Sequence, residues 1–182
     1  VMGVFAAQEE YSENFDTKSS DLSTWENWTI TAYSGPNSAS LDTAPGDDPS
    51  NKSLKIVKDN SENPMHAVVK FTPLSGNIIL EEKFMIDSAQ VFYSKIPLVQ
   101  DSNGNDVVHA MIHETNFMVH DGNSVAKTLG TVKVSSWNTL KISMDTEQKV
   151  FSLWLNGVKV ASNFNFYIPD GQPGPNLAEN VG

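Results

Sequence analysis

Three histidines lie close together in the chain, at spacings that suit one face of a strand pair. His109 and His113 are four residues apart in the run HAMIH, so on a β-strand both side chains point to the same face. His120 comes in the next apolar run, and it shares that face if the two strands pair. Tyr93, from the strand before, joins them under the same pairing. Imidazole and phenol groups together could exchange protons, bind sugar hydroxyls or hold a metal ion.

The residue types leave these alternatives open. A three-histidine metal site at this spacing lacks a nearby carboxylate. Half-exposed imidazoles that carry out no chemistry are a common alternative. A face with histidine, asparagine, tyrosine and tryptophan is typical of neutral sugar recognition, in which aromatic rings stack on apolar sugar faces and polar groups bind hydroxyls.

Trp154 is the second candidate for ligand binding. It alternates with Ser152 and Asn156, whereas Phe151 and Leu153 belong to the opposite, apolar face. An outward tryptophan on a strand is a candidate stacking platform for a sugar ring, and packing beneath a loop is the alternative.

Acidic residues offer a third kind of chemistry. Glu81 and Glu82 are adjacent, so on a strand they point to opposite faces and cannot act as a pair. Glu114 and Asp121 could approach each other across a hairpin and provide the two carboxylates of a glycosidase. The alternative is that both are solvated residues at strand ends.

Composition limits the classes of ligand that suit this chain. The 182 residues carry a formal net charge of −10, contain no cysteine, and have 12 basic residues that are all lysine. Arginine is the preferred bidentate partner of phosphate and carboxylate, so we expect no nucleic acid or anionic polymer as ligand. A neutral polysaccharide or a divalent cation fits this charge better. No apolar run reaches the ~18–20 residues that span a membrane.

The positions of short apolar runs predict an all-β fold. Residues 137–160 read as two alternating runs joined by polar turns, which is the pattern of antiparallel hairpins with Asn156-Gly157 as a tight turn. We expect one domain over residues 11–182, after an extension over residues 1–10. The predicted strands are Tyr11–Asp16, Trp28–Tyr33, Ser53–Lys58, Met65–Thr72, Gly76–Asp87, Gln90–Leu98, Asp106–Glu114, Asn116–His120, Thr131–Val134, Thr139–Asp145, Val150–Asn156, Lys159–Ala161 and Asn165–Ile168, with loops at Ser34–Asn51 and Val99–Asn105.

Three motifs resemble one superfamily. They are the W-x-x-L-x-I-x-x-D…L-W-L-N-G-x-x-V arrangement over residues 137–160, Glu13-Asn-Phe-Asp16 followed by two tryptophans, and the run NKSLKI at residues 51–56. Together they resemble the concanavalin A-like (LamG-like) jelly roll of lectins, carbohydrate-binding modules and polysaccharide-degrading enzymes. The resemblance implies a two-sheet antiparallel β-sandwich with Trp25, Trp28 and Trp137 in its core.

The resemblance also implies a structural Ca²⁺ ion. Glu13 and Asp16 would provide carboxylates, beside the loop of residues 45–51 and a backbone carbonyl near Asn51, and oxygen donors are what Ca²⁺ prefers. The family's closing strand, which usually adds an aspartate, has no clear counterpart before Gly182. We therefore expect an atypical last strand, or a following domain or chain that covers the edge.

The function expected from these features is non-catalytic binding of a neutral polysaccharide, by a module of a secreted or cell-surface bacterial protein. The ligand-binding residues would be Trp154, Tyr93, His109, His113 and His120. A glycoside hydrolase or polysaccharide lyase of the same fold is one alternative, and a structural or adhesive surface domain is another. The apolar start VMGVFAA fits the end of a secretion signal, or linker sequence.

Overall fold

The computed structural model describes residues 13–32, 38–44, 46, 50–57, 65–70 and 74–168. The chain divides into two compact units, residues 1–71 and 72–182, and each is described by itself. The predicted single domain over residues 11–182 stays a prediction. In the described part of the chain, no helix is long and apolar enough to cross a membrane.

The first unit contains two small antiparallel sheets. Strand β1 (Trp28–Ala32) pairs with β4 (Met65–Val69), and β2 (Ser38–Thr43) pairs with β3 (Lys52–Val57). A short 3₁₀ turn, η1 (Leu22–Thr24), precedes β1 and is capped by the Asp21 carboxylate, which accepts a hydrogen bond from the Ser23 N–H. Strand β2 lies within the predicted loop Ser34–Asn51, so that loop assignment is wrong. The predicted strand Tyr11–Asp16 is also wrong where the structure describes it, because Phe15 has a φ of 63°.

An aromatic cluster organises the first unit. The Phe15 ring lies 5.5 Å from the rings of both Trp25 and Trp28, and the two indoles are 6.0 Å apart. Trp25 is buried and donates its indole N–H to the Ser19 carbonyl, whereas Trp28 is half-buried. Both tryptophans therefore pack within this cluster of the first unit.

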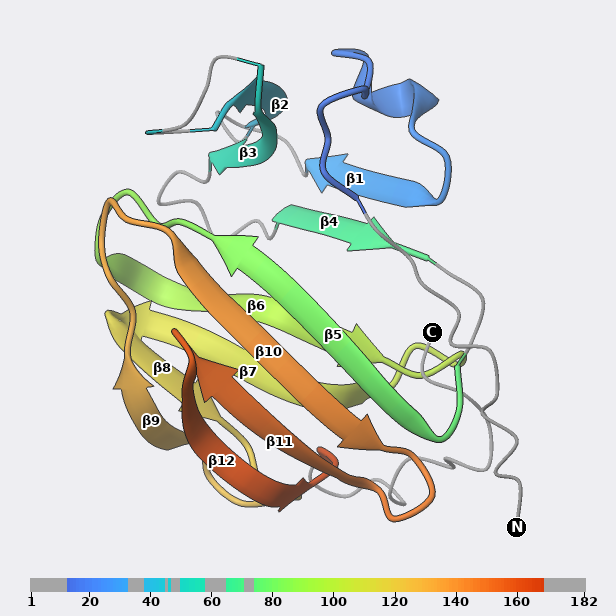
Figure 1. Ribbon diagram of the computed structural model, residues 1–182, viewed down its shortest axis with the longest axis vertical. Helices are drawn as coiled ribbons and strands as arrows, with labels where there is room; N and C mark the ends of the chain where they lie inside the picture. Colours follow the sequence, from blue (N-terminus) through green and yellow to red (C-terminus); the bar gives the residue numbers. More distant parts are fainter. Residues whose placement is uncertain are drawn as a thin grey trace, which may run out of the picture. The chain divides into compact units, whose positions relative to one another are not determined.

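The second unit is a two-sheet antiparallel β-sandwich (Figure 1). Sheet I has the strand order β12-β11-β10-β5, and sheet II has the order β6-β7-β8-β9. The strands are β5 (Asn77–Phe84), β6 (Gln90–Gln100), β7 (Asp106–Glu114), β8 (Asn116–Val119), β9 (Lys127–Thr131), β10 (Asn138–Asp145), β11 (Val150–Leu155) and β12 (Val158–Asn165). The predicted all-β sandwich is confirmed, with eight of the twelve strands of the described residues in its two sheets.

The sandwich core follows the alternation of the sequence. Leu140, Ile142, Phe151 and Leu153 of sheet I are at most 1% exposed, and they pack against residues of sheet II that include Phe117. The predicted inward faces of these strands are therefore confirmed. Among the side chains that the structure describes, the buried residues of the core are Ile78, Phe84, Ile86, Val99, Val107, Val108, Ala110, Ile112, Phe117, Val119, Val132, Leu140, Ile142, Met144, Phe151, Leu153, Leu155, Ala161 and Phe166.

Trp137 differs from the prediction. It is half-buried, and the Lys83 ammonium lies 6.0 Å from its ring centroid. The reason is the alternation of β10, in which Asn138 and Leu140 face inward. Trp137 directly precedes Asn138, so it faces outward.

Turn residues fix the hairpins as predicted. Asn156 and Gly157 have φ values of 50° and 80°, and this left-handed backbone joins β11 to β12. In the β6–β7 turn, one Asp101 oxygen accepts the N–H groups of Asn103 and Asn105 at 2.9 and 2.8 Å. The Asp101 carboxylate therefore stabilises a hairpin turn.

Candidate functional site

Trp154 lies on the outer face of sheet I, at the centre of a row that crosses all four strands. Glu81 of β5 is opposite Lys141 of β10, Lys141 is opposite Trp154 of β11, and Trp154 is opposite Lys159 of β12. The indole is half-buried, while its neighbour Leu153 is fully buried in the core. The predicted outward direction of Trp154 is confirmed.

Charged side chains flank the indole in this row. The Lys159 ammonium lies 5.0 Å from the Trp154 ring centroid, and the Lys141 ammonium is 2.9 Å from a Glu81 carboxylate oxygen. Both partners of that ion pair are well exposed, at 41% and 65%. This outer face therefore presents one aromatic ring among hydrogen-bonding groups, which is an arrangement that can bind a sugar.

The histidines lie on the other side of the sandwich. Val108, Ala110 and Ile112 of β7 are in the core, so alternation directs His109 and His113 to the outer face of sheet II. The expectation that they share a face with Trp154 is wrong, because the two sheets pack core to core and their outer faces point in opposite directions.

Two of the predicted site residues on this face, His109 and His120, come together. His120 donates its backbone N–H to the His109 carbonyl, and their ring centroids are 5.0 Å apart. His113 pairs with Asn116 beside the hairpin turn, about 13 Å further along β7 at ~3.3 Å per residue. Tyr93 belongs to β6, and its side chain lies outside the described part of the structure.

A tyrosine that the sequence did not single out completes the cluster. The Tyr167 ring centroid is 4.7 Å from that of His109 and 4.8 Å from that of His120, edge-on to both. Its backbone N–H donates to the Val107 carbonyl at 2.8 Å. This contact depends on a long-range pairing between residue 167 and β7, which no local pattern in the sequence encodes.

A carboxylate and a lysine adjoin the ring cluster. One Asp106 oxygen lies 3.6 Å from both His109 Nδ1 and the Lys95 ammonium, and the other accepts a hydrogen bond from Gln100.

A register shift between Val99 and Gln100 allows consecutive residues Val107 and Val108 both to be buried in the core.

The two imidazoles lie in different surroundings. Burial lowers the pKa of His109 to about 4, with Lys95 and His120 adding to the effect and Asp106 opposing it, so this ring is neutral at pH 7. His109 Nδ1 is buried, and among the residues that the structure describes it has no hydrogen-bond partner. His120 Nδ1 lies 2.7 Å from the Ser124 carbonyl, which can only accept, so this nitrogen carries a proton.

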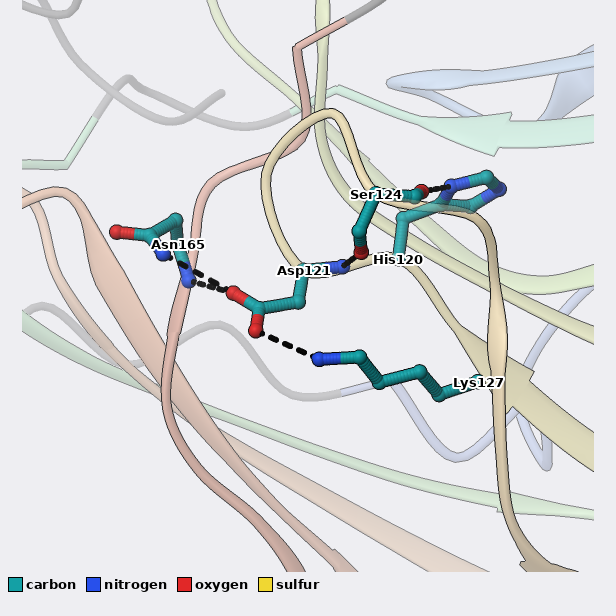
Figure 2. Close-up of polar contacts among 5 residues, drawn as sticks. All are labelled: His120, Asp121, Ser124, Lys127 and Asn165. Carbon is teal, nitrogen blue, oxygen red and sulfur yellow. Dashed lines mark hydrogen bonds and ion pairs between the residues drawn. The ribbon is translucent and has the colours of Figure 1, made fainter.

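A second set of contacts lies directly beside His120 (Figure 2). The Asp121 carboxylate accepts hydrogen bonds from the Asn165 backbone N–H and side-chain amide, at 2.9 and 3.0 Å, and from the Lys127 ammonium at 3.0 Å. Burial acts to raise the pKa of Asp121, but these hydrogen bonds outweigh it and hold that pKa below its ordinary value. Asp121 is thus an anionic anchor between the β8–β9 loop and the end of β12.

The predicted acid pair is not formed. Glu114 lies at the β7–β8 turn, whereas Asp121 follows the far end of β8. At ~3.3 Å per residue, about 20 Å of strand separates them. This exceeds the carboxylate spacing of glycosidases, which is ~5–10 Å.

Glu82 is a titratable group that sequence reasoning did not select. It lies on the same face of β5 as Leu80 and Phe84, so it faces the sandwich interior, while Glu81 faces outward. Burial raises the pKa of Glu82 to about 7. The residue that sits opposite it on β10, Leu140, is apolar and 1% exposed.

The predicted calcium ligands are partly brought together. Asp16 accepts the backbone N–H of Lys52 at 2.9 Å, so this carboxylate lies next to residue 51 as expected. Glu13, however, already pairs with the Lys18 ammonium at 2.9 Å. Residues 47–49 of the predicted loop lie outside the described part of the chain. These donors alone do not fit Ca²⁺, which takes six to eight oxygen ligands.

Within the described ranges, no group of three or more histidine, aspartate or glutamate side chains is placed to hold a metal ion. The three-histidine metal site considered from the sequence is therefore not formed there. His109 and His120 adjoin each other, but His113 is too far along the strand to join them.

Comparison with known proteins adds a likeness in fold. No protein-family model matches the sequence, and no curated protein matches it. A solved structure named "Sialidase" is similar over 94% of this chain, with a TM-score of 0.63 and 14% sequence identity. The chain corresponds to 17% of that structure's length. At this identity the likeness concerns the fold alone.

Proposed function

We propose that this chain is a non-catalytic glycan-binding domain and that the outer face of sheet I binds the sugar. Trp154 is the observation that carries the proposal. Its indole faces away from the core on a central strand, between side chains that can bind hydroxyl groups. A ring with this placement is suited to stacking against the apolar face of a sugar.

The energies favour stacking over the present contact. A lysine above an exposed indole contributes about 0.5–1 kcal/mol, whereas a nucleobase stacked on an aromatic side chain contributes about 1–3 kcal/mol, and we take this as the scale for a stacked sugar ring. A sugar can therefore displace the Lys159 ammonium from Trp154 with a net gain. The overall charge of −10 favours a neutral glycan, because an acidic polymer is repelled at long range.

The fold neighbour supports the same class of function. Its name, "Sialidase", is that of a glycan-active protein, and this chain corresponds to a small part of its length. We infer that the chain is a module of a larger secreted or cell-surface protein of a bacterium, in keeping with the jelly-roll superfamily that its motifs resemble.

An array of neutral and acidic oligosaccharides tests this function. We expect binding to neutral oligosaccharides, with no new reducing ends when the bound sugar is incubated with the protein. Absence of binding to every sugar would support a structural or adhesive domain instead.

A lyase is the second candidate, and the ring cluster on sheet II favours it. A neutral imidazole at His109 beside the Tyr167 phenol and the Lys95 ammonium offers a base, an acid and a cation on one face. Release of unsaturated products from a uronate polymer, lost in Tyr167→Phe, would establish this activity in place of simple binding.

A further inference from the structure

Residues 165–168 connect the two sheets of the sandwich at one end. The Phe166 N–H donates to the Lys149 carbonyl beside sheet I, and the Tyr167 N–H donates to the Val107 carbonyl of sheet II. Phe166 is 2% exposed and its ring stacks on Phe151 at 6.4 Å. The segment therefore closes the core at this end.

Two separate sets of contacts hold this segment against sheet II. The polar set is the Asp121 anchor on Asn165, together with Gly122, whose N–H donates to the Asn165 carbonyl at 3.0 Å and whose carbonyl accepts the Ile168 N–H at 3.4 Å. The aromatic set is Tyr167 against His109 and His120. Only the aromatic set contains groups that ordinarily gain a proton near pH 6.

Positive charge on His109 would share its nearest carboxylate, Asp106, with the Lys95 ammonium. The titratable and charged groups that face it are Asp106 on β7, Lys95 on β6, His109 and His120 on facing strands, Tyr167 on the segment itself, and Asp121 and Lys127 around the next loop. The Asp106 carboxylate already pairs with Lys95 and accepts a hydrogen bond from Gln100, and the Asp121 carboxylate already accepts hydrogen bonds from Lys127 and Asn165. Two imidazolium rings with centroids 5.0 Å apart would repel each other between these groups.

We propose that residues 165–168 are a pH-sensitive clasp, which acid opens by protonating His109 and His120 so that Tyr167 leaves the two rings while the rest of the sandwich stays folded. Tyr167 packs edge-on against both imidazoles, so their separation removes its support on two sides. The carbonyl of Val107 then exchanges the Tyr167 N–H for water.

Amide hydrogen exchange by NMR, corrected for the intrinsic pH dependence, tests this clasp. We expect protection of the Tyr167 N–H to fall at least tenfold between pH 7 and pH 4, while the Ile142 N–H in the core keeps its protection. The double variant His109→Gln/His120→Gln should lose this pH response. His120→Gln alone should weaken it, which keeps the test informative if the double variant does not fold.

His113→Gln is the matched control, because His113 lies on the same strand away from the ring cluster. It should keep the full response. Constant protection of Tyr167 in the unmodified protein would overturn the proposal. An undiminished pH response in His120→Gln would also overturn it, because the response would then come from other groups.

Discussion

Glu82 has a carboxyl group in surroundings that favour its neutral form. Its pKa of about 7 lies above the ordinary value of 4.5, so between these pH values the folded protein binds a proton that the unfolded chain has lost. Stability from this group is full below pH 4.5 and is lost as the pH rises through 7. His109 has the opposite sign, since its pKa falls from 6.5 to about 4 and stability is lost as the pH falls through this range.

Glu82→Gln should therefore stabilise the protein at high pH and leave it unchanged at low pH. We expect the free energy of unfolding to increase by up to about 3 kcal/mol at pH 8, because each pH unit between 4.5 and the pKa of about 7 corresponds to ~1.4 kcal/mol, and to stay the same at pH 4.5. Urea denaturation at both pH values measures it. Glu81→Gln, on the exposed face of the same strand, is the control. An equal change at the two pH values would contradict the burial of Glu82.

His109→Gln should show the reverse dependence. It removes the cost of charging a buried imidazole, so the difference in unfolding free energy from the unmodified protein should shift in favour of the variant as the pH falls from 6.5 to 4, by up to about 3 kcal/mol. Thermal unfolding at a series of pH values measures this difference. A difference that does not vary with pH would show that His109 is solvated.

The sequence could predict which face of its own strand a residue occupies, because side chains alternate along a strand. Leu153 and Trp154 lie on the faces expected from their neighbours. Trp137 was assigned to the core from resemblance, although the alternation of β10 places it outward. Tyr167 could not be assigned, because its neighbours His109 and His120 are far away in the sequence.

At the scale of elements, a buried asparagine joins two turns. Asn138 is fully buried at the start of β10. Its amide donates to the carbonyls of Lys133 and Ser136, and its oxygen accepts from the Lys133 N–H and the Asn156 side chain. All the hydrogen-bonding capacity of this side chain is used, so it couples the approach to β10 with the β11–β12 turn.

Asn138→Ala should destabilise the sandwich by about 3 kcal/mol, because it removes the four hydrogen bonds of a fully buried side chain, each of which contributes ~0.5–1.5 kcal/mol. Chemical denaturation measures the change. Asn123→Ala, at an exposed loop position, should stay within about 0.5 kcal/mol. A small effect at Asn138 would mean that water replaces its hydrogen bonds.

The hairpins themselves were predictable from their turn residues, but the sheet that each hairpin joins was not. Asn156-Gly157 marked its turn correctly, and the pairing of β11 with β12 followed. Whether β7 and β11 share a sheet depends on contacts across the whole core. The predicted site therefore combined residues that the sandwich places on opposite faces.

At the scale of the whole molecule, the calcium prediction concerns the first unit. The Asp16 carboxylate lies beside Lys52, but the Glu13 carboxylate forms an ion pair with Lys18. An ion completed by oxygens of the neighbouring loop would bind the folded state and raise the melting temperature by mass action. We expect a higher melting temperature in millimolar Ca²⁺ than in EDTA. Equal melting temperatures would show that the calcium prediction is wrong, with Lys18 as the partner of Glu13.

The two outer faces of the sandwich separate the candidate functions. Sheet I presents Trp154 in a row of exposed polar groups, which suits binding. Sheet II presents His109, His120 and Tyr167, which suit proton exchange or the proposed clasp. Because the faces point in opposite directions, a substitution on one leaves the other intact, and the two functions can be tested independently.

Sugar binding by the outer face of sheet I is tested by the affinity of Trp154→Ala for an oligosaccharide that the unmodified protein binds, measured together with the melting temperature of the variant. We predict binding at least tenfold weaker, about 1.4 kcal/mol, with the fold intact because the indole faces outward. A loss of roughly 3–5 kcal/mol in stability, as expected for a core cavity, with unchanged affinity would contradict a binding role for the outer face of sheet I.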